Sequence, residues 1–186
     1  LHNDVNTILG NNLYDFTKFP SIIKSKLEWV NSPEKSKNPD MLRSFSNPFS
    51  NNGGIKVLNG NLGKSIIKIS SVKKEHLKIT APIIIFEDQH ELISSFQKNN
   101  LNKDFIAVLR FQGPKAKGMP ELHKLTPILS ILLNNGYKVA LITDGRMSGA
   151  SGRVPAAIHL SPEAIDGGLL SKLIDGDIIT LDAVSY

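Results

Sequence analysis

The sequence predicts an α/β domain, in which a mixed β-sheet or small β-barrel is flanked by helices. Short apolar runs of strand length, such as residues 83–86 (IIIF) and 139–142 (VALI), outnumber the segments with helical spacing. Two amphipathic patterns, at residues 88–98 and 121–134, lie between these runs. Glycine, proline and asparagine separate the segments, as expected where the chain turns between elements.

The first 45 residues show little of this patterning. Residues 1–10 have apolar side chains at helical spacing and end in Gly10, which predicts a short helix. Residues 11–45 are rich in Asn, Ser, Pro and Lys, with isolated apolar side chains such as Phe16 and Trp29. We therefore expect a long connector there, and a folded domain over residues 46–186.

The first half of that domain begins after a turn signal at residues 51–54. Residues 55–58 and 65–72 read as strands, and the Asn-Gly-Asn sequence between them favours a hairpin-like connection. A buried strand at residues 83–86 follows Pro82, and the helix at 88–98 comes next. Residues 105–111 form another predicted strand, which ends at the turn formed by Gly113 and Pro114.

The second half starts with the helix predicted at residues 121–134, which closes at Asn135 and Gly136. A strand at 137–142 follows, and Ser161 with Pro162 has the pattern of a helix start. The last predicted strand is at residues 178–181. Polar loops follow the strands at 105–111 and 137–142, so the two loops would share a cleft if these strands are neighbours.

Composition narrows the functional classes. The 186 residues carry 22 Lys and Arg against 17 Asp and Glu, a net charge of +5, but the basic residues are scattered and form no stripe of the kind that nucleic acids require. This charge suits a small anionic ligand. Apolar runs stay far below the roughly 20 residues that span a bilayer, and no secretory signal is present, so we expect a soluble cytoplasmic protein. With no cysteine, this chain cannot supply thiolates to an iron–sulfur cluster.

The most distinctive stretch is residues 139–152, VALITDGRMSGASG, where a strand-like run passes into a loop rich in glycine and serine. Glycines allow backbone N–H groups to approach a ligand closely, with the hydroxyls of Ser148 and Ser151 beside it. An ordinary turn with solvated serines is the alternative. The loop matches neither the phosphate-binding patterns of nucleotide-binding proteins nor the G-x-S-x-G elbow of hydrolases.

Two longer motifs carry a family resemblance. Residues 110–127 (RFQGPKAKGMPELHKLTP) and 143–164 (TDGRMSGASGRVPAAIHLSPEA), with DGDII at 175–179, resemble the C-terminal domain of the dihydroxy-acid and phosphogluconate dehydratase family. The similarity extends upstream through residues 47–70 and more weakly to the start of the chain. It implies a β-barrel-like swivelling domain with flanking helices, and it implies that residues 1–45 are the end of an N-terminal domain and its linker.

The resemblance also assigns roles to residues. It implies that Glu121 is a Mg²⁺ ligand, whereas the sequence alone suggests only a carboxylate in the first turn of a helix. It implies that Ser148, as an alkoxide, removes the proton from C2 of the substrate and that Ser151 hydrogen-bonds the substrate. A serine hydroxyl is too weak an acid for this role unless nearby positive charge and N–H donors stabilise the alkoxide.

Further polar residues lie beside these motifs. Asp144 and Arg146 would position the loop or a substrate carboxylate, with pairing to each other as the alternative. His123, Lys124 and Arg153 are candidates for binding a substrate phosphate, with simple exposure to solvent as the alternative. His159, within an apolar run, reads as a packed core histidine.

As a whole, the resemblance implies a hydro-lyase that converts 6-phosphogluconate to 2-keto-3-deoxy-6-phosphogluconate, the first dedicated step of the Entner–Doudoroff pathway. It implies an iron–sulfur cluster held by cysteines of an N-terminal domain, Mg²⁺, and a homodimer. Two alternatives stay open, a dehydratase of another sugar acid or dihydroxy acid, and a small-molecule binding module without catalysis. Neither nucleic acid nor membrane is an expected partner.

Overall fold

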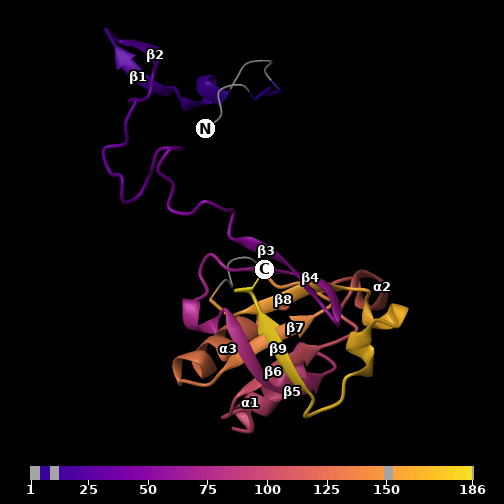
Figure 1. Cartoon of the computed structure of the whole chain (residues 1–186). Helices are drawn as coiled ribbons and strands as arrows, with labels where there is room; N and C mark the ends of the chain where they lie inside the picture. The colour runs from indigo at the N-terminus through magenta and orange to yellow at the C-terminus, as the bar shows by residue number, and fades with distance from the viewer. Residues whose placement is uncertain (1–4, 9–12, 149–152, 186) are drawn as a thin grey trace. The chain divides into compact units, whose positions relative to one another are not determined.

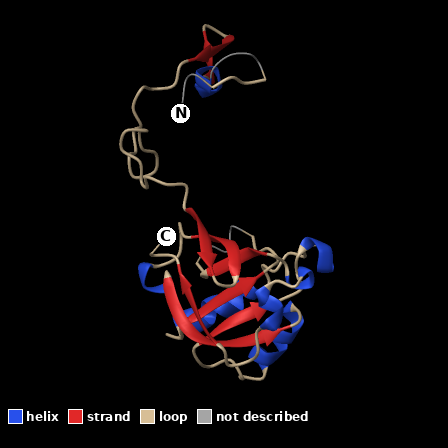
Figure 2. Cartoon of the chain, turned by 45° about the vertical axis from the view of Figure 1, so that its right-hand side comes forward, coloured by secondary structure: helices blue, strands red, loops and turns tan. Residues whose placement is uncertain are grey.

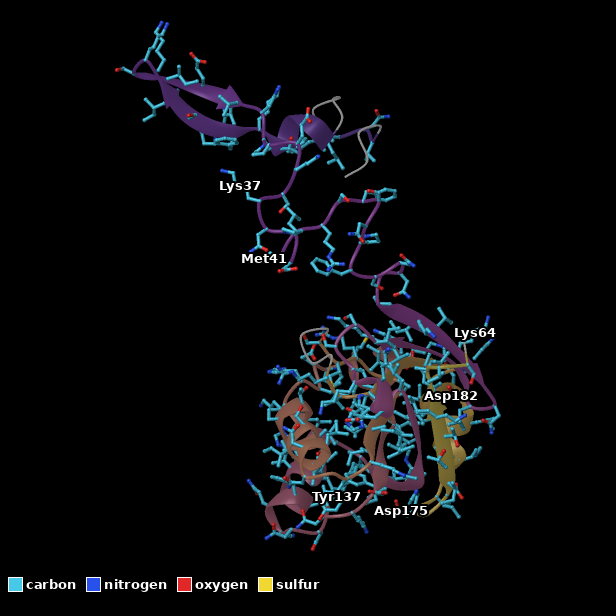
Figure 3. The ribbon with its side chains drawn as sticks, turned by 60° about the vertical axis from the view of Figure 1, so that its left-hand side comes forward. Lys37, Met41, Lys64, Tyr137, Asp175 and Asp182 are labelled. Carbon is cyan, nitrogen blue, oxygen red and sulfur yellow. The ribbon has the colours of Figure 1, made fainter. Side chains whose placement is uncertain are left out.

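The computed structural model describes residues 5–8, 13–148 and 153–185. Clustering of contacts divides the chain into two compact units, residues 1–51 and 52–186, which we describe separately (Figure 1). Two residues of the first unit, Lys37 and Met41, are labelled in Figure 3 and lie on a segment without helix or strand.

The first unit contains a β-hairpin where we expected a connector. After the 3-10 helix η1 (Leu13–Thr17), β1 (Phe19–Ile23) pairs antiparallel with β2 (Lys26–Val30). Lys24 and Ser25 turn the chain at φ values of 49° and 61°. A turn of this kind usually has Asn-Gly, and its absence explains why the hairpin escapes sequence analysis.

The helix expected at the start of the chain is wrong for the part that the structure describes. Residues 5–8 are not helical, and the side chain of Ile8 is 99% exposed. A helix of about ten residues is unstable in water unless its apolar face packs against something. The other residues of that expected helix lie outside the described part of the chain.

The second unit is built on a curled, mixed sheet of seven strands in the order β3-β4-β8-β7-β6-β5-β9 (Figure 2). The pairs β5–β6, β6–β7 and β7–β8 are parallel, and the outer pairs are antiparallel. The curled sheet confirms the expected α/β fold with a barrel-like sheet. The strands are β3 (Ile55–Gly60), β4 (Gly63–Lys68), β5 (Lys78–Phe86), β6 (Phe105–Leu109), β7 (Val139–Thr143), β8 (Ala156–Ser161) and β9 (Ile178–Asp182).

The described residues form three α-helices beside the sheet, and none of these is long and apolar enough to cross a membrane. Asp88 caps the first of them, because its carboxylate accepts hydrogen bonds from the N–H groups of His90 and Glu91. The helices are α1 (Gln89–Gln97), α2 (Pro114–Lys117) and α3 (Leu125–Asn134), with the 3-10 turns η2 (Lys74–His76), η4 (Ala164–Asp166) and η5 (Leu169–Lys172).

Apolar side chains cover both faces of the sheet, which is why its central strands are continuous apolar runs. Along β6, Phe105 belongs to the cluster that packs against α1 and α3, whereas Ile106 belongs to the cluster inside the curl. Leu129 of α3 is fully buried in the first cluster, and Leu181 of β9 is buried in the second. The period-2 alternation of a strand thus supplies two cores at once.

A recess of about 650 Å³ lies within the curl, lined by residues of the β3–β4 hairpin and of β9, among them Leu58, Leu62 and Leu181. Lys64 at the start of β4 and Asp182 at the end of β9 are labelled in Figure 3. The ammonium group of Lys56 on β3 donates to the carbonyl oxygen of Ala183 at 2.8 Å, which links the two ends of the sheet.

The strand β8 was missed by sequence analysis, and two expectations beside it are wrong. His159 was expected in the core, whereas it is exposed with φ of 55°. The pairing of β4 with β8 is irregular beside it, and this irregularity turns the side chain outward. Ser161 ends β8 instead of capping a helix, and Gly167 and Gly168 stop the following turn η4 after three residues.

Candidate functional site

Two loops meet at one edge of the sheet. Strands β6 and β7 are parallel neighbours, with Leu109 opposite Thr143, so the chain leaves both strands on the same side. The adjacency that sequence analysis left conditional is therefore confirmed. This is the position at which open α/β sheets place ligands.

Glu121 reaches this edge from an extended segment and not from a helix, which corrects the expectation that it lies in the first turn of α3. The helix α2 ends at Lys117, Gly118 caps it with φ of 68°, and Met119 follows with φ of 59°. Glu121 then forms an isolated parallel bridge with Arg146. The backbone N–H of the next residue, Leu122, donates to the carbonyl oxygen of Arg146 at 3.3 Å, so backbone contacts join the two loops.

The Glu121 carboxylate contacts two groups of the loop after β7. Its Oε1 accepts a hydrogen bond from the backbone N–H of Ser148 at 2.7 Å. Its Oε2 lies 3.1 Å from Nη1 of Arg146, and the Nε of Arg146 donates to the carbonyl oxygen of Met119 at 3.0 Å. The carboxylate is 27% exposed and the guanidinium side chain 48% exposed, so both remain open to a ligand.

The carboxylate of Glu121 fits a hard cation. Each of its oxygens has two lone pairs, and the contacts above use one on each oxygen, which leaves room for a metal–oxygen bond. Magnesium prefers such oxygen ligands and commonly uses only one or two carboxylates. Within residues 5–8, 13–148 and 153–185, no group of three or more His, Asp or Glu side chains converges on one point.

Asp144 has a different environment from its neighbours in the motif. Its carboxylate is buried, and it accepts hydrogen bonds from the N–H of Gln112 at 2.9 Å and of Ala164 at 3.0 Å. It joins the loops after β6 and β7 to η4. The pairing between Asp144 and Arg146 that we considered is not what the structure shows, since Arg146 pairs with Glu121.

The glycine that follows Asp144 is required by close packing. A Cβ atom on Gly145 would lie 2.6 Å from Cβ of Gln112, far inside normal contact. Its N–H donates to Oγ1 of buried Thr143 at 2.9 Å. Asp144 and Gly145 therefore hold the two loops together in the interior, whereas the side chains of Arg146 and Ser148 are exposed.

The remaining predicted site residues are spread more widely. Ser148 is exposed beside Glu121, and Ser151 lies outside the described residues. His123 and Lys124 are exposed immediately before α3. Arg153 lines a separate recess of about 220 Å³.

The recess beside Arg153 also contains residues that sequence analysis missed. Lys73 and His76 line it, although 77 residues separate His76 from Arg153. The one signal in the sequence was the basic composition of residues 73–76, KKEH. The larger recess inside the curl contains none of the site residues that the sequence pointed to.

The sequence of the chain matches a known protein family. The family described as "Dihydroxy-acid/6-phosphogluconate dehydratase C-terminal" matches residues 40–186. The chain belongs to this family. The two motifs that carried the resemblance are the two dehydratase-family loops that meet through Glu121, Arg146 and Ser148.

Several relatives are identical to the chain at about half of the aligned positions. It is 51% identical over 185 residues to a phosphogluconate dehydratase of Pseudomonas aeruginosa and 51% identical over 182 residues to one of Escherichia coli K12, which covers 100% and 98% of the chain. A dihydroxy-acid dehydratase of Caldanaerobacter subterraneus is 38% identical over 152 residues, or 80% of the chain. The chain spans about 30% of the length of the two phosphogluconate dehydratases and 27% of the dihydroxy-acid dehydratase.

Proposed function

We propose that this chain forms the C-terminal domain of a hydro-lyase that dehydrates 6-phosphogluconate to 2-keto-3-deoxy-6-phosphogluconate. The observation that carries the proposal is the contact of Glu121 with both Arg146 and the N–H of Ser148, on two loops within the residues that match the family. Identity of 51% to proteins named phosphogluconate dehydratase supports this substrate over others in the family.

The reaction removes the elements of water from two adjacent carbons. The proton on C2 goes to a base, and the C3–O bond breaks so that the hydroxyl leaves as water after protonation. The resulting enol takes a proton at C3 and becomes the 2-keto product. The protein must therefore supply a base at C2 and hold the carboxylate end of the substrate in a fixed position.

Residues of this chain suit these tasks. Ser148 is the base in our proposal, and the hydrogen bond from its backbone N–H to Glu121 fixes where its side chain begins. Arg146, half exposed beside it, would contribute positive charge toward a substrate carboxylate. Ser151 would add a hydroxyl hydrogen bond to the substrate.

Glu121 would hold Mg²⁺ through one carboxylate oxygen, and the ion would supply the positive charge that favours an ionised substrate. An iron–sulfur cluster would act as the Lewis acid toward the C3 hydroxyl. Because this chain has no cysteine, we propose that the thiolate ligands of the cluster belong to the part of the relatives' length that lies outside the match.

The wider setting is also a proposal. The substrate places the enzyme at the first dedicated step of the Entner–Doudoroff pathway, in gluconate metabolism in the cytoplasm. We propose a homodimer in which each domain of this kind works with an N-terminal domain. Residues 1–45 would end that domain and link it to residues 46–186.

A second substrate class is favoured by one observation. The chain is also 38% identical to a protein named dihydroxy-acid dehydratase, a name without a phosphate, which supports an unphosphorylated substrate as the second candidate. In our proposal the site around Glu121 binds the carboxylate and the neighbouring hydroxyl of the substrate, and both substrate classes have these groups. Discrimination would then depend on whatever contacts the far end of the substrate.

The test is a dehydratase assay on the natural polypeptide that carries this chain, prepared anaerobically with iron and Mg²⁺. Turnover of 6-phosphogluconate well above that of gluconate and 2,3-dihydroxyisovalerate, and its loss in Ser148→Ala, would support the proposal. Turnover of only the unphosphorylated compounds would move the protein to the second class. Absence of turnover with all three would favour a binding module without catalysis.

A further inference from the structure

The small recess beside Arg153 is built from three parts of the chain. Ser71, Lys73 and His76 come from the segment around η2, and Ser130 and Asn134 come from the second half of α3. Arg153 closes the set from the segment before β8. Apart from the apolar Leu133, the lining residues therefore carry hydroxyl, amide, imidazole, ammonium or guanidinium groups, and every one of these groups can donate a hydrogen bond.

Such a lining selects an anion with several acceptor oxygens. Lys73 and Arg153 bring two full positive charges, and phosphate is recognised by charge-assisted donors of this kind. The C-terminal end of α3 carries a partial negative charge, which disfavours an anion. The two full positive charges of Lys73 and Arg153 outweigh it. The volume of about 220 Å³ is below the roughly 300 Å³ at which pockets for whole ligands begin, so the recess suits one end of a ligand.

One negative charge lies at its rim. The carboxylate of Glu75 is 3.6 Å from the ammonium of Lys73 and 3.5 Å from Nε2 of His76. Glu75 is not among the residues that line the recess, and its side chain is 66% exposed. It competes with an incoming anion for the same two donors, so its removal is expected to strengthen anion binding.

The recess and the loop that carries Ser148 are both in contact with α3. Oγ1 of Thr126, near the start of α3, contacts Sδ of Met147 at 3.6 Å, directly before Ser148. Ser130 and Asn134 come four and eight residues later, or roughly 6 and 12 Å along the helix axis. In 6-phosphogluconate, six bonds of about 1.5 Å in a zigzag separate C2 from phosphorus by roughly 7 Å.

We propose that the recess formed by Lys73, His76, Arg153 and the second half of α3 binds the phosphate of the substrate and selects phosphorylated sugar acids. The assignment rests on the function proposed above. Of the three residues that the sequence suggested for phosphate binding, only Arg153 lines the recess, because His123 and Lys124 lie outside it. In this proposal Lys73 and His76, and not His123 and Lys124, determine specificity together with Arg153.

Calorimetric titration of the natural polypeptide with 6-phosphogluconate, gluconate and inorganic phosphate tests the assignment. Arg153→Ala and Lys73→Ala should each weaken 6-phosphogluconate binding about tenfold and leave gluconate binding unchanged. Glu75→Gln should tighten 6-phosphogluconate binding about threefold. Lys103→Ala, which removes an exposed lysine outside the recess, is the matched control and should change neither.

The outcomes separate this inference from the proposed function. Unchanged 6-phosphogluconate affinity in Arg153→Ala and Lys73→Ala, with turnover intact, overturns the recess and leaves the dehydratase standing. Inorganic phosphate binding that Arg153→Ala abolishes while 6-phosphogluconate affinity stays the same shows an anion site unrelated to the substrate, and also overturns it. If the wild type binds no 6-phosphogluconate, both proposals fail together.

Discussion

The backbone N–H of Ser148 donates a hydrogen bond to Oε1 of Glu121 across 2.7 Å, although 27 residues separate the two in sequence. A side chain from the loop after β6 thus fixes the backbone of the loop after β7. The same carboxylate pairs with Arg146 through its other oxygen. Changes at Glu121 should therefore affect the position and the charge of the site separately, depending on which group replaces the carboxylate.

Glu121→Gln should remove the negative charge at residue 121 and leave the backbone of Ser148 in its position. The amide oxygen can still accept from the Ser148 N–H, but it no longer balances Arg146 or offers an anionic ligand to Mg²⁺. We expect dehydratase activity of the natural polypeptide to fall roughly 100-fold or more. The free energy of unfolding should change by less than about 1 kcal/mol, because the ion pair is partly exposed. Steady-state kinetics and urea denaturation measure the two effects.

Asp166→Asn is the control for that change. Asp166 also carries an ion pair, with Lys115 at 2.7 Å, and its side chain is 41% exposed. Activity should stay within about twofold of wild type. An equal loss of activity in the two variants would show that Glu121 has no special role.

Asp144→Asn should destabilise the domain without removing a surface charge. An amide offers only one acceptor oxygen, so the buried N–H of either Gln112 or Ala164 would face an NH₂ group. We expect a loss of about 2–3 kcal/mol, measured by urea denaturation of the 186-residue chain. Asp88→Asn is the matched control, because Asn caps a helix about as well as Asp and should cost under roughly 0.5 kcal/mol. Equal losses would contradict the buried role of Asp144.

The sequence predicts most of the sheet and α1, because these elements, unlike β8, each carry their own signal. Strand β6 is an apolar run, and α1 has an amphipathic pattern and an Asp cap. The site is predictable only in part. Glu121, Arg146 and Ser148 stand out by motif, but the contacts that join them depend on β6 and β7 being neighbours, which no local pattern encodes.

Three features of the site and of β8 could not be read from the sequence, because each depends on distant parts of the chain. Asp144 looks like its exposed neighbours in the motif until its partners at Gln112 and Ala164 are known. His159 lies in an apolar run, yet an irregularity in pairing with another strand turns it outward. Lys73 could not be linked to Arg153 without the fold.

Asp182 should make the stability of the sheet edge depend on pH. The ammonium of Lys78, 2.8 Å away, and the N–H groups of Ser185 and Val184 hold the pKa of its carboxyl well below the usual value of about 3.9. Because the folded state favours the charged form, this stabilisation is complete above about pH 5 and is lost as the pH falls further. The stability difference between wild type and Asp182→Asn should therefore shrink between about pH 5 and pH 2 in urea denaturation. A difference that stays constant over this range would show that the carboxylate charge is not responsible.

Substitutions in the turn of the β1–β2 hairpin should increase the stability of the hairpin. Lys24 and Ser25 both adopt left-handed backbone conformations, at φ of 49° and 61°, which cost energy for residues other than Gly and Asn. The double change Lys24→Asn with Ser25→Gly introduces the Asn-Gly pair that such turns favour, and it should stabilise the hairpin by about 1 kcal/mol. Amide hydrogen exchange across residues 19–30 should then slow by about fivefold. Ser25→Val, which introduces a β-branched side chain at a left-handed position, should accelerate exchange instead. Slower exchange in Ser25→Val would mean that β-propensity and not turn geometry limits this hairpin.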